Sequence, residues 1–149
     1  KDFNLIPKIK KHLNKIEIPS DLAVNFRGKR KELLLEKFPQ NYEIWDIGEQ
    51  TIKNYKKEIA KAKAIFFKGS PGLFQQKDFE KGTKEILKAI ANSRAFSVIA
   101  GGQSSDALKK FKIPKSKFSY VSLSGGSLVA YLAGEKLPGL EALAHSIKT

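Results

Sequence analysis

Short apolar runs alternate along the chain with longer segments in which apolar residues recur every three or four positions. The short runs are typical of buried strands, which we expect at 22–26, 33–35, 44–48, 64–67, 96–99 and 118–121. The periodic segments indicate amphipathic helices at 4–14, 48–62, 77–92, 104–111, 128–132 and 138–146. In the segment 77–92, for example, Phe79, Thr83, Ile86 and Ile90 fall on one helical face.

From residue 64 onward, three strand–helix units follow one another. Alternation of this kind predicts a parallel sheet with helices on its faces. We therefore expect an α/β fold, specifically a Rossmann-like three-layer α/β/α domain with a mostly parallel sheet. Residues 1–149 are expected to form one domain, since nothing in the sequence resembles a linker. In this architecture ligands bind beyond the carboxyl ends of the strands.

Glycine turns follow three of the predicted strands, at 68–69, 100–105 and 122–127. The second reads A-G-G-Q-S-S, and Ser104 or Ser105 is predicted to cap the helix behind it. Such turns aim backbone N–H groups and the positive end of a helix at one point, which favours phosphates. Glycines also follow strands simply because tight turns need positive φ, and that interpretation stays open. The double-glycine turns at 100–105 and 122–127 match neither the nucleotide-binding pattern G-x-x-x-x-G-K-[ST] nor G-x-G-x-x-G.

Other polar and aromatic residues offer less chemistry. His12 and His145 have no nearby carboxylate or second histidine, so we expect surface or packing roles for both. Trp45 lies among apolar neighbours and is expected in the core. Asp46 is predicted to cap the helix that begins near Gly48. Because no paired carboxylates or nucleophile triad is evident, any reaction would depend on positioning and electrostatics, as phosphoryl transfer does.

The chain is strongly basic, with a net charge of +13, and it contains no cysteine. Residues 1–63 carry a net charge of +6 and residues 64–149 one of +7, so the excess is spread along the chain. This distribution favours a solvated, lysine-rich surface that attracts anionic metabolites over a dedicated nucleic-acid interface. The longest apolar runs are too short to cross a membrane. A cytoplasmic location is compatible with this composition, and disulfide or thiolate chemistry is excluded.

Taken in order, several segments of the chain resemble phosphoglycerate kinase, in the latter part of its C-terminal, nucleotide-binding domain. W-D-I-G-E-Q-T-I at 45–52 is similar to the family's L-D-I-G-P-x-T-I, and S-V-I-A-G-G-Q-S at 97–104 is similar to S-V-V-G-G-G-D-S. The other matching segments are 64–75, 79–83, 118–126 and 137–143. Their shared order and spacing make the resemblance specific.

The resemblance implies transfer of a phosphoryl group between 1,3-bisphosphoglycerate and ADP, with Mg²⁺ and ATP/ADP as cofactors. It places Gly48 at the adenine and Gln75 at the ribose hydroxyls. The nucleotide-binding residues that it implies are Gly48, Lys68, Gly69, Gln75, Gly101, Gly102, Gln103 and Ser104. The residues that it implies at the transferring group are Gly102, Gly125 and Gly126. The sugar-acid substrate, 3-phosphoglycerate or 1,3-bisphosphoglycerate, would bind an N-terminal domain that this chain lacks.

Three substitutions depart from the family pattern. Gln103 stands where an acidic residue helps to hold the metal–nucleotide complex, so no metal ligand is assigned with certainty. Gln75 replaces the ribose-binding glutamate, although an amide can still bond hydroxyls. Lys68 replaces an asparagine and adds a cation beside the expected phosphates. The chain is therefore expected to be a kinase fragment that is inactive alone. The alternative is a non-catalytic nucleotide- or polyanion-binding module with a degenerate kinase site.

Overall fold

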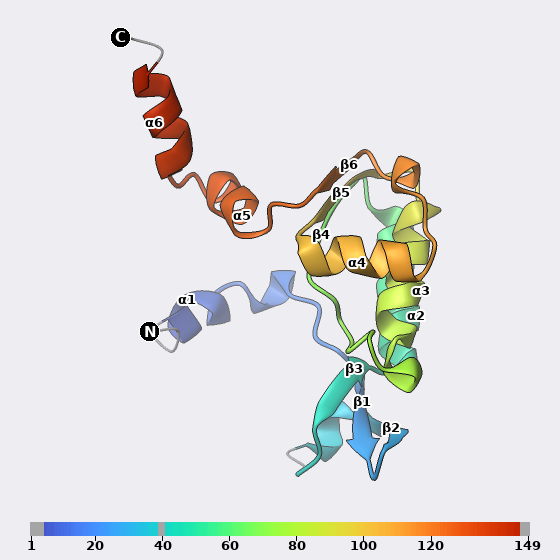
Figure 1. The fold of residues 1–149 in the computed structure, drawn as a ribbon. Coiled ribbons are helices and arrows are strands. Elements are labelled where there is room, and N and C mark those ends of the chain that lie inside the picture. Colours follow the sequence, from blue (N-terminus) through green and yellow to red (C-terminus); the bar gives the residue numbers. More distant parts are fainter. Residues whose placement is uncertain (1–4, 39–40, 147–149) are drawn as a thin grey trace.

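The computed structural model describes residues 5–38 and 41–146, and within them the strands form two sheets (Figure 1). The first sheet is antiparallel, with the order β2-β1-β3. It consists of β1 (Asp21–Phe26), β2 (Lys29–Leu34) and β3 (Ile44–Ile47). The second sheet is parallel, with the order β4-β5-β6. It consists of β4 (Ala64–Lys68), β5 (Phe96–Ala100) and β6 (Tyr120–Ser122).

Helices precede, separate and follow these strands. The α-helices of the described residues are α1 (Ile6–Lys10), α2 (Glu49–Lys61), α3 (Lys81–Ala91), α4 (Gly102–Lys110), α5 (Gly126–Leu132) and α6 (Pro138–Ser146). Single 3₁₀ turns lie at Leu13–Lys15, Leu35–Lys37, Lys77–Phe79 and Lys115–Lys117. Of the described helices, none is long and apolar enough to cross a membrane.

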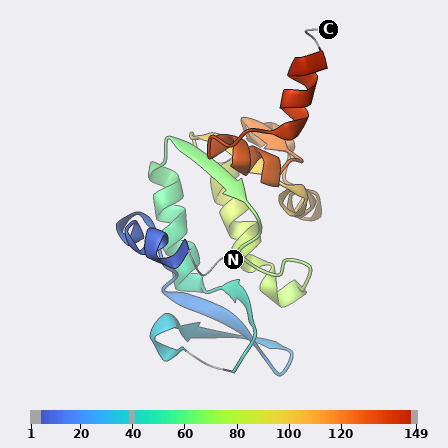
Figure 2. The ribbon, with the colours of Figure 1, turned by 90° about the vertical axis from the view of Figure 1, so that its left-hand side faces the viewer.

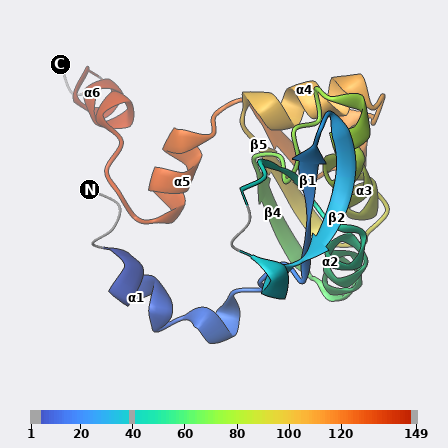
Figure 3. The ribbon, with the colours of Figure 1, turned by 90° about the horizontal axis from the view of Figure 1, so that it is seen from below.

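The hydrophobic core lies between the parallel sheet and the helices α2, α3 and α4 (Figure 3). On the sheet side it is bounded by Ile65, Phe67 and Ile99. The helices contribute the buried residues Ile52, Ile86, Leu87, Ile90, Ala107 and Leu108. Burying one such Leu or Ile side chain stabilises a fold by about 1.5–3 kcal/mol. This one apolar layer therefore supplies most of the driving force for folding.

The handedness of the crossover connections explains why α3 and α4 lie on the same face of the parallel sheet. The connections β4–α3–β5 and β5–α4–β6 both advance in the same direction across the sheet. Because crossovers between parallel strands are right-handed, both helices must lie on the same side of the sheet. On the opposite side, α5 places Leu128 and Leu132 beside Phe66, Phe96 and Val98. The predicted parallel sheet flanked by helices is thus confirmed.

The antiparallel sheet was not foreseen as a separate unit, and its hairpin is tighter than expected. The strands expected at 22–26 and 33–35 leave residues 27–32 as the connection between them. In the structure the turn is only Arg27 and Gly28, both with positive φ (52° and 80°), and β2 begins at Lys29. A two-residue turn with this backbone matches the twist of antiparallel strands, so pairing continues up to the turn. The basic segment therefore belongs to a strand, on which Lys29 and Lys31 are exposed and Arg30 is largely covered.

The prediction of one helix over 4–14 is wrong in its length. Within the described part of that segment, α1 ends at Lys10, and a 3₁₀ turn follows at Leu13–Lys15. The apolar stripe of Leu5, Ile6, Ile9 and Leu13 is about half exposed rather than buried. A short helix gains most of its stability from packing, and here the described residues offer this stripe no surface. Figure 1 shows α1 standing away from the sheets.

The starts of α2 and α3 are capped by aspartates distant in sequence, which corrects the role predicted for Asp46. Asp21 accepts hydrogen bonds from the N–H groups of Gln50 (3.0 Å) and Thr51 (2.7 Å) at the start of α2. Asp46 instead accepts the N–H of Gly82 (2.8 Å) at the start of α3. The expected helix over 77–92 begins at 81 as a result. Each carboxylate satisfies orphan helix amides and complements the positive helix end.

Asp46 also forms a buried ion pair with Arg30 of β2, at 2.8 Å. Arg30 further donates to the carbonyl oxygens of Ile47 (2.9 Å) and Asp78 (3.2 Å). Burial raises the pKa of Asp46, although the bonds from Gly82 and Arg30 favour its charged form. Breaking one partner of such a pair leaves an uncompensated buried charge. The pair therefore fixes the hairpin to α3.

The aromatic and histidine predictions have mixed outcomes. Trp45 is half-buried rather than enclosed, and its ring packs edge-on against Phe79 with 4.9 Å between centroids. His12 and His145 are both exposed, in agreement with the surface role expected for them.

Replacing Asp21 by Asn tests the capping of α2 through its pH dependence. Burial alone would raise the pKa of Asp21, but hydrogen bonds from Thr51 and Gln50 outweigh it, so the pKa lies below its usual value. Because its pKa is lower in the folded state, the charged carboxylate stabilises the fold at pH values above the unfolded-state pKa of about 3.9. This stabilisation is lost as the pH falls through the folded-state pKa. We expect Asp21→Asn to cost about 1–3 kcal/mol at pH 7 and less at pH 3.

Urea denaturation at both pH values measures this difference. Glu58→Gln serves as the control, because Glu58 is exposed and forms a surface ion pair with Lys61 of the same helix. An equal loss at pH 7 and pH 3 in Asp21→Asn would contradict a cap that depends on charge.

Candidate functional site

Parallel register brings the three glycine turns to one edge of the sheet. Lys68 pairs with Ala100, and Ala100 with Ser122, so β4, β5 and β6 end level with one another. At this edge the structure contains a cavity of about 130 Å³. Its lining consists of Lys68, Gly69, Ala100, Gly101, Gly102, Gln103 and Ser104. The predicted convergence of the first two turns is thus a feature of the structure.

The turn after β5 depends on the backbone of Gly101. Its φ and ψ are +94° and 155°, a conformation that only glycine adopts readily. This turn lets the N–H of Gly101 donate to Ser122 O (2.9 Å), while α4 begins at the next residue. The first amides of any helix lack helical acceptors. In α4 they belong to Gly102, Gln103 and Ser104, which line the cavity.

The helix cap differs from the prediction. We expected Ser104 or Ser105 as the N-cap, but Gly101 occupies that position, and both serines lie buried inside the first turn. The Oγ of Ser104 accepts the N–H of Gly69 (3.2 Å) and so joins the turns after β4 and β5. The Oγ of Ser105 is buried without a hydrogen-bond partner in the described structure. Ser104 therefore connects two turns instead of capping the start of α4.

Lys68 and Gly125 complete the surroundings of the cavity. A Cβ placed on Gly125 would lie 3.4 Å from both Cα of Gly101 and Cε of Lys68, so these three residues are in close contact. Gly69 has φ +86° and turns the chain directly after Lys68. Lys68 is exposed, and no carboxylate lines the cavity. The charge of Lys68 and the positive amino-terminal end of α4 therefore act together to attract anions.

Four predicted site residues do not line this cavity: Gly48 and Gln75 of the nucleotide-binding set, and Gly125 and Gly126 of the set at the transferring group. Gly48 is buried at the N-cap of α2, where a Cβ would come within 2.2 Å of the Asp21 carboxyl group. Gln75 is exposed on the loop after β4, next to the buried Phe74. Gly126 is exposed as the first residue of α5. The nucleoside-binding roles of Gly48 and Gln75 stay predictions.

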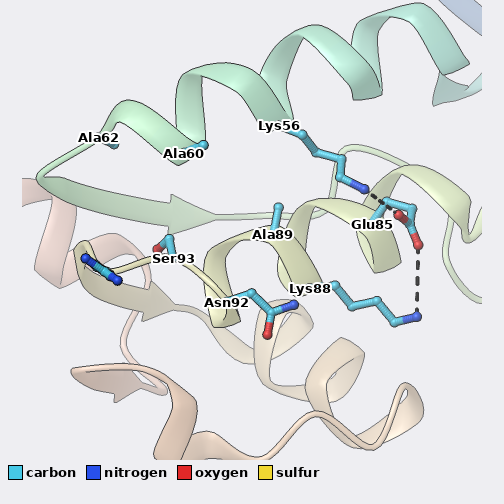
Figure 4. A pocket seen from close by; sticks show the side chains of 9 residues that line it. Lys56, Ala60, Ala62, Glu85, Lys88, Ala89, Asn92 and Ser93 are labelled. Atoms are coloured by element: carbon cyan, nitrogen blue, oxygen red, sulfur yellow. Dashed lines mark hydrogen bonds and ion pairs between the residues drawn. The ribbon is translucent and has the colours of Figure 1, made fainter.

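The structure also contains larger cavities, which the sequence did not indicate. One of about 720 Å³ lies between the ends of α2 and α3 and is lined by Lys56, Ala60, Ala62, Glu85, Lys88, Ala89, Asn92, Ser93 and Arg94 (Figure 4). Glu85 is paired there with Lys56 (2.8 Å) and Lys88 (4.0 Å). This cavity adjoins the amino ends of β4 and β5, whereas ligands of parallel sheets bind at the carboxyl ends. Its one carboxylate, Glu85, is already paired with the two lysines, and the lining keeps a net positive charge.

A site for Mg²⁺ held by protein carboxylates is missing from the described residues. No group of three or more His, Cys, Asp or Glu side chains in 5–38 and 41–146 could hold a metal ion. At the cavity, Gln103 offers a neutral amide and Lys68 a cation. Mg²⁺ prefers carboxylate and phosphate oxygens, so these residues do not fit a metal of their own.

The parallel sheet, the helices packed on it and the glycine turns at its carboxyl edge define an α/β protein. The phosphoglycerate kinase family model matches residues 3–135, and the chain belongs to this family. It is 42% identical to phosphoglycerate kinase of Methanothermus fervidus over 149 residues, which are 99% of this chain and 36% of the relative. It thus spans about a third of the length of that curated relative.

Solved structures of the family agree with the fold. The structure of phosphoglycerate kinase from Pyrococcus horikoshii matches 98% of this chain with a TM-score of 0.83 at 34% identity. That of Coxiella burnetii matches 93% with a TM-score of 0.79 at 28% identity. In both cases the match covers 38% of the solved chain.

Alanine substitutions at Gly101 and Gly102 should have opposite effects on stability. Gly101→Ala forces a side chain into a glycine-only conformation and should cost about 1–3 kcal/mol. Gly102 is helical, and nothing lies within 4 Å of a Cβ added there. Gly102→Ala should therefore stabilise the chain by about 0.4–1 kcal/mol through the unfolded state. Thermal unfolding of both variants checks the geometry, and equal effects would contradict the described turn.

Proposed function

We propose that this chain is the nucleotide-phosphate-binding part of a phosphoglycerate kinase, which transfers a phosphoryl group between 1,3-bisphosphoglycerate and ADP. The observation that carries the proposal is the meeting of Lys68, Gly101 and Gly125 at the carboxyl edge of the parallel sheet. Family membership supports it independently. Since the chain spans about a third of its relatives, we expect it to be inactive alone.

The chemistry asked of this chain is positioning and charge stabilisation. Phosphoryl transfer needs little covalent help from the protein, because its transition state mainly spreads negative charge over oxygen atoms. The first amides of α4 would donate to phosphate oxygens, and Lys68 would add a positive charge beside them. Gly102, Gly125 and Gly126 would let the transferring group approach the backbone, since glycine has no side chain to obstruct it.

The nucleoside would bind away from the phosphates. From the family resemblance we assign Gly48 to the adenine pocket and Gln75 to the ribose hydroxyls. The Gln75 amide can both donate to and accept from a hydroxyl, so it can replace a carboxylate in this role. Its exposed position leaves the amide accessible to a ligand.

Mg²⁺ has no carboxylate ligand at this cavity, so we assign it no protein-held position. ATP or ADP with Mg²⁺ remains the proposed ligand, with the metal carried by phosphate oxygens. The sugar-acid substrates would bind the part of the enzyme that lies outside this chain, and the setting would be the cytoplasm. The dispersed +13 charge argues against nucleic acid as the main partner.

A second candidate is a non-catalytic module that binds nucleotides or other polyanions. The exchange of the expected acidic residue for Gln103, beside the cation Lys68, favours it. Such a module would bind phosphates without needing a metal.

Titration with ADP tests the proposal directly. We expect a dissociation constant on the order of 0.1–1 mM, because a small open site buries little of the ligand. Lys68→Asn should weaken binding about 2- to 5-fold through loss of an exposed charge. Lys115→Asn removes the same charge beyond the far end of α4 and should leave binding unchanged. No calorimetric or NMR response at several millimolar ADP would overturn the proposal.

Gln103→Asp tests whether this residue faces the phosphates. With Mg²⁺ present, a new carboxylate should strengthen ADP binding by roughly 1 kcal/mol, because Mg²⁺ keeps most of its waters. With EDTA, the same substitution should weaken binding, since the carboxylate then only repels phosphate. Titrations of both proteins in the two buffers give the comparison. An identical change in both would contradict the placement of Gln103 at the phosphates and the matching of this turn to the family's.

A further inference from the structure

The cavity between the ends of α2 and α3 lies apart from the glycine turns at the carboxyl edge of the parallel sheet. Its volume of about 720 Å³ is within the range of cavities that bind small molecules. The two helices lie side by side and end near the start of β4 (Figure 2). The N–H of Phe96 donates to the carbonyl oxygen of Lys63 (2.9 Å), so the segments that follow the two helices are joined. Two helices and their connections therefore frame this cavity.

The charged groups that line this cavity are mostly basic. They are Lys56, Glu85, Lys88 and Arg94, and we call the cavity that they line the basic pocket. Glu85 lies 2.8 Å from Lys56 and 4.0 Å from Lys88. The hydrogen bond from Lys56 lowers the pKa of Glu85, so this carboxylate is charged at neutral pH. Three cations and one carboxylate leave the lining with two positive charges.

The basic pocket is elongated along the two helices. Figure 4 shows Lys56, Glu85 and Lys88 at one end and Ser93 toward the other. Arg94 directly follows Ser93, so its backbone belongs to the second end. Roughly six helical residues separate the ends, which corresponds to about 9 Å. Within residues 5–38 and 41–146, no Asp or Glu forms an ion pair with Arg94.

Between the two ends the lining is short and uncharged. Ala60, Ala62 and Ala89 line this part, and Figure 4 shows the side chain of Asn92 beside it. Alanine side chains leave space that longer side chains would fill. Among the described residues, the side-chain amide of Asn92 has no hydrogen-bond partner, so it is available to a ligand.

The usual role of cations near helix ends does not account for this arrangement. Lysines in the last turn of a helix commonly complement its dipole, which requires no cavity. Here cations from two helices and a loop surround one volume, and Glu85 compensates only part of their mutual repulsion. A cavity lined mainly by one sign of charge concentrates counter-ions. Because the principal ligands of parallel sheets bind at the carboxyl ends of the strands, this pocket would be a second site, formed by side chains.

We propose that the basic pocket binds a small molecule with an anionic group, carboxylate or phosphate, at each end. One group pairs with Arg94, because a guanidinium can hold a carboxylate or phosphate through two parallel hydrogen bonds. The other pairs with Lys88, which is farther from Glu85 than Lys56 is. The uncharged spacer lies along the alanines. The proposal is independent of nucleotide binding at the glycine turns.

Titration with acids of increasing length tests the proposal. Acetate, succinate, adipate and suberate carry the same acidic group at different spacings, and tripolyphosphate carries phosphate instead. We expect adipate and suberate to bind with dissociation constants on the order of 0.1–1 mM, since an open pocket buries little of the ligand. Acetate should show no binding. NMR signals of the Asn92 amide and of Arg94 Nε should shift. The tighter of suberate and tripolyphosphate identifies the acidic group that the pocket prefers.

Arg94→Gln should weaken binding of the preferred probe about 3- to 10-fold, because it removes the bidentate partner. Arg27→Gln is the matched control, since it removes the same charge from the exposed turn between β1 and β2. It should leave binding unchanged. Circular dichroism of each variant shows that the chain is folded, since both side chains lie outside the core.

Glu85→Gln should have the opposite effect. It releases Lys56 and Lys88 from their shared carboxylate, and we expect binding about 2- to 5-fold tighter. Glu58→Gln changes the net charge equally but lies outside the lining, so it should leave binding unchanged. An equal gain in both variants would show a general charge effect and overturn the proposal.

Further outcomes would also overturn it. These are no response to any probe at several millimolar, acetate binding as tightly as suberate, and an equal loss in Arg94→Gln and Arg27→Gln. Lys68→Asn should leave binding unchanged, and a loss in this variant would move the probe to the glycine turns and overturn the proposal. A chain that binds suberate but not ADP would contradict only the proposed function.

Discussion

The buried carboxylate of Asp46 holds together parts of the chain that lie far apart in sequence. It pairs with Arg30 of β2 at 2.8 Å and accepts the N–H of Gly82 at the start of α3. A Cβ on Gly72 or Gly82 would come within 2.1 Å of its Oδ1, so only glycine fits at either position. The antiparallel sheet, the loop after β4 and α3 all depend on this one group for their relative placement.

The glycine-lined edge of the parallel sheet is separate from that network, but it also depends on small residues that allow segments to approach closely. Gly101 and Gly125 let the turns after β5 and β6 approach one another, and Ser104 ties in the turn after β4. The result is a concentration of backbone donors next to Lys68 with no carboxylate between them. In a chain whose positive charge is otherwise dispersed, the proposed phosphate site depends on this local geometry more than on the total charge.

The same topology that builds one hydrophobic core leaves the opposite side of the sheet incomplete. Right-handed connections commit α3 and α4 to one face, and the exposed rings of Phe66 and Phe96 are the consequence on the other.

The parallel strands, the helices packed on them and the positions of the glycine turns could be predicted from the sequence alone, because hydrophobic period and glycine placement are local properties. The sequence also carried the family resemblance through the order of its motifs. Three contacts could not be predicted in this way: Asp46 caps α3, Asp21 caps α2 and Ser104 bonds to Gly69. Each joins residues about 30 or more positions apart, so it depends on how the whole chain folds. The tertiary structure also decided that the apolar stripe near Ile9 stays exposed, because periodicity says which residues share a face but not whether anything covers it.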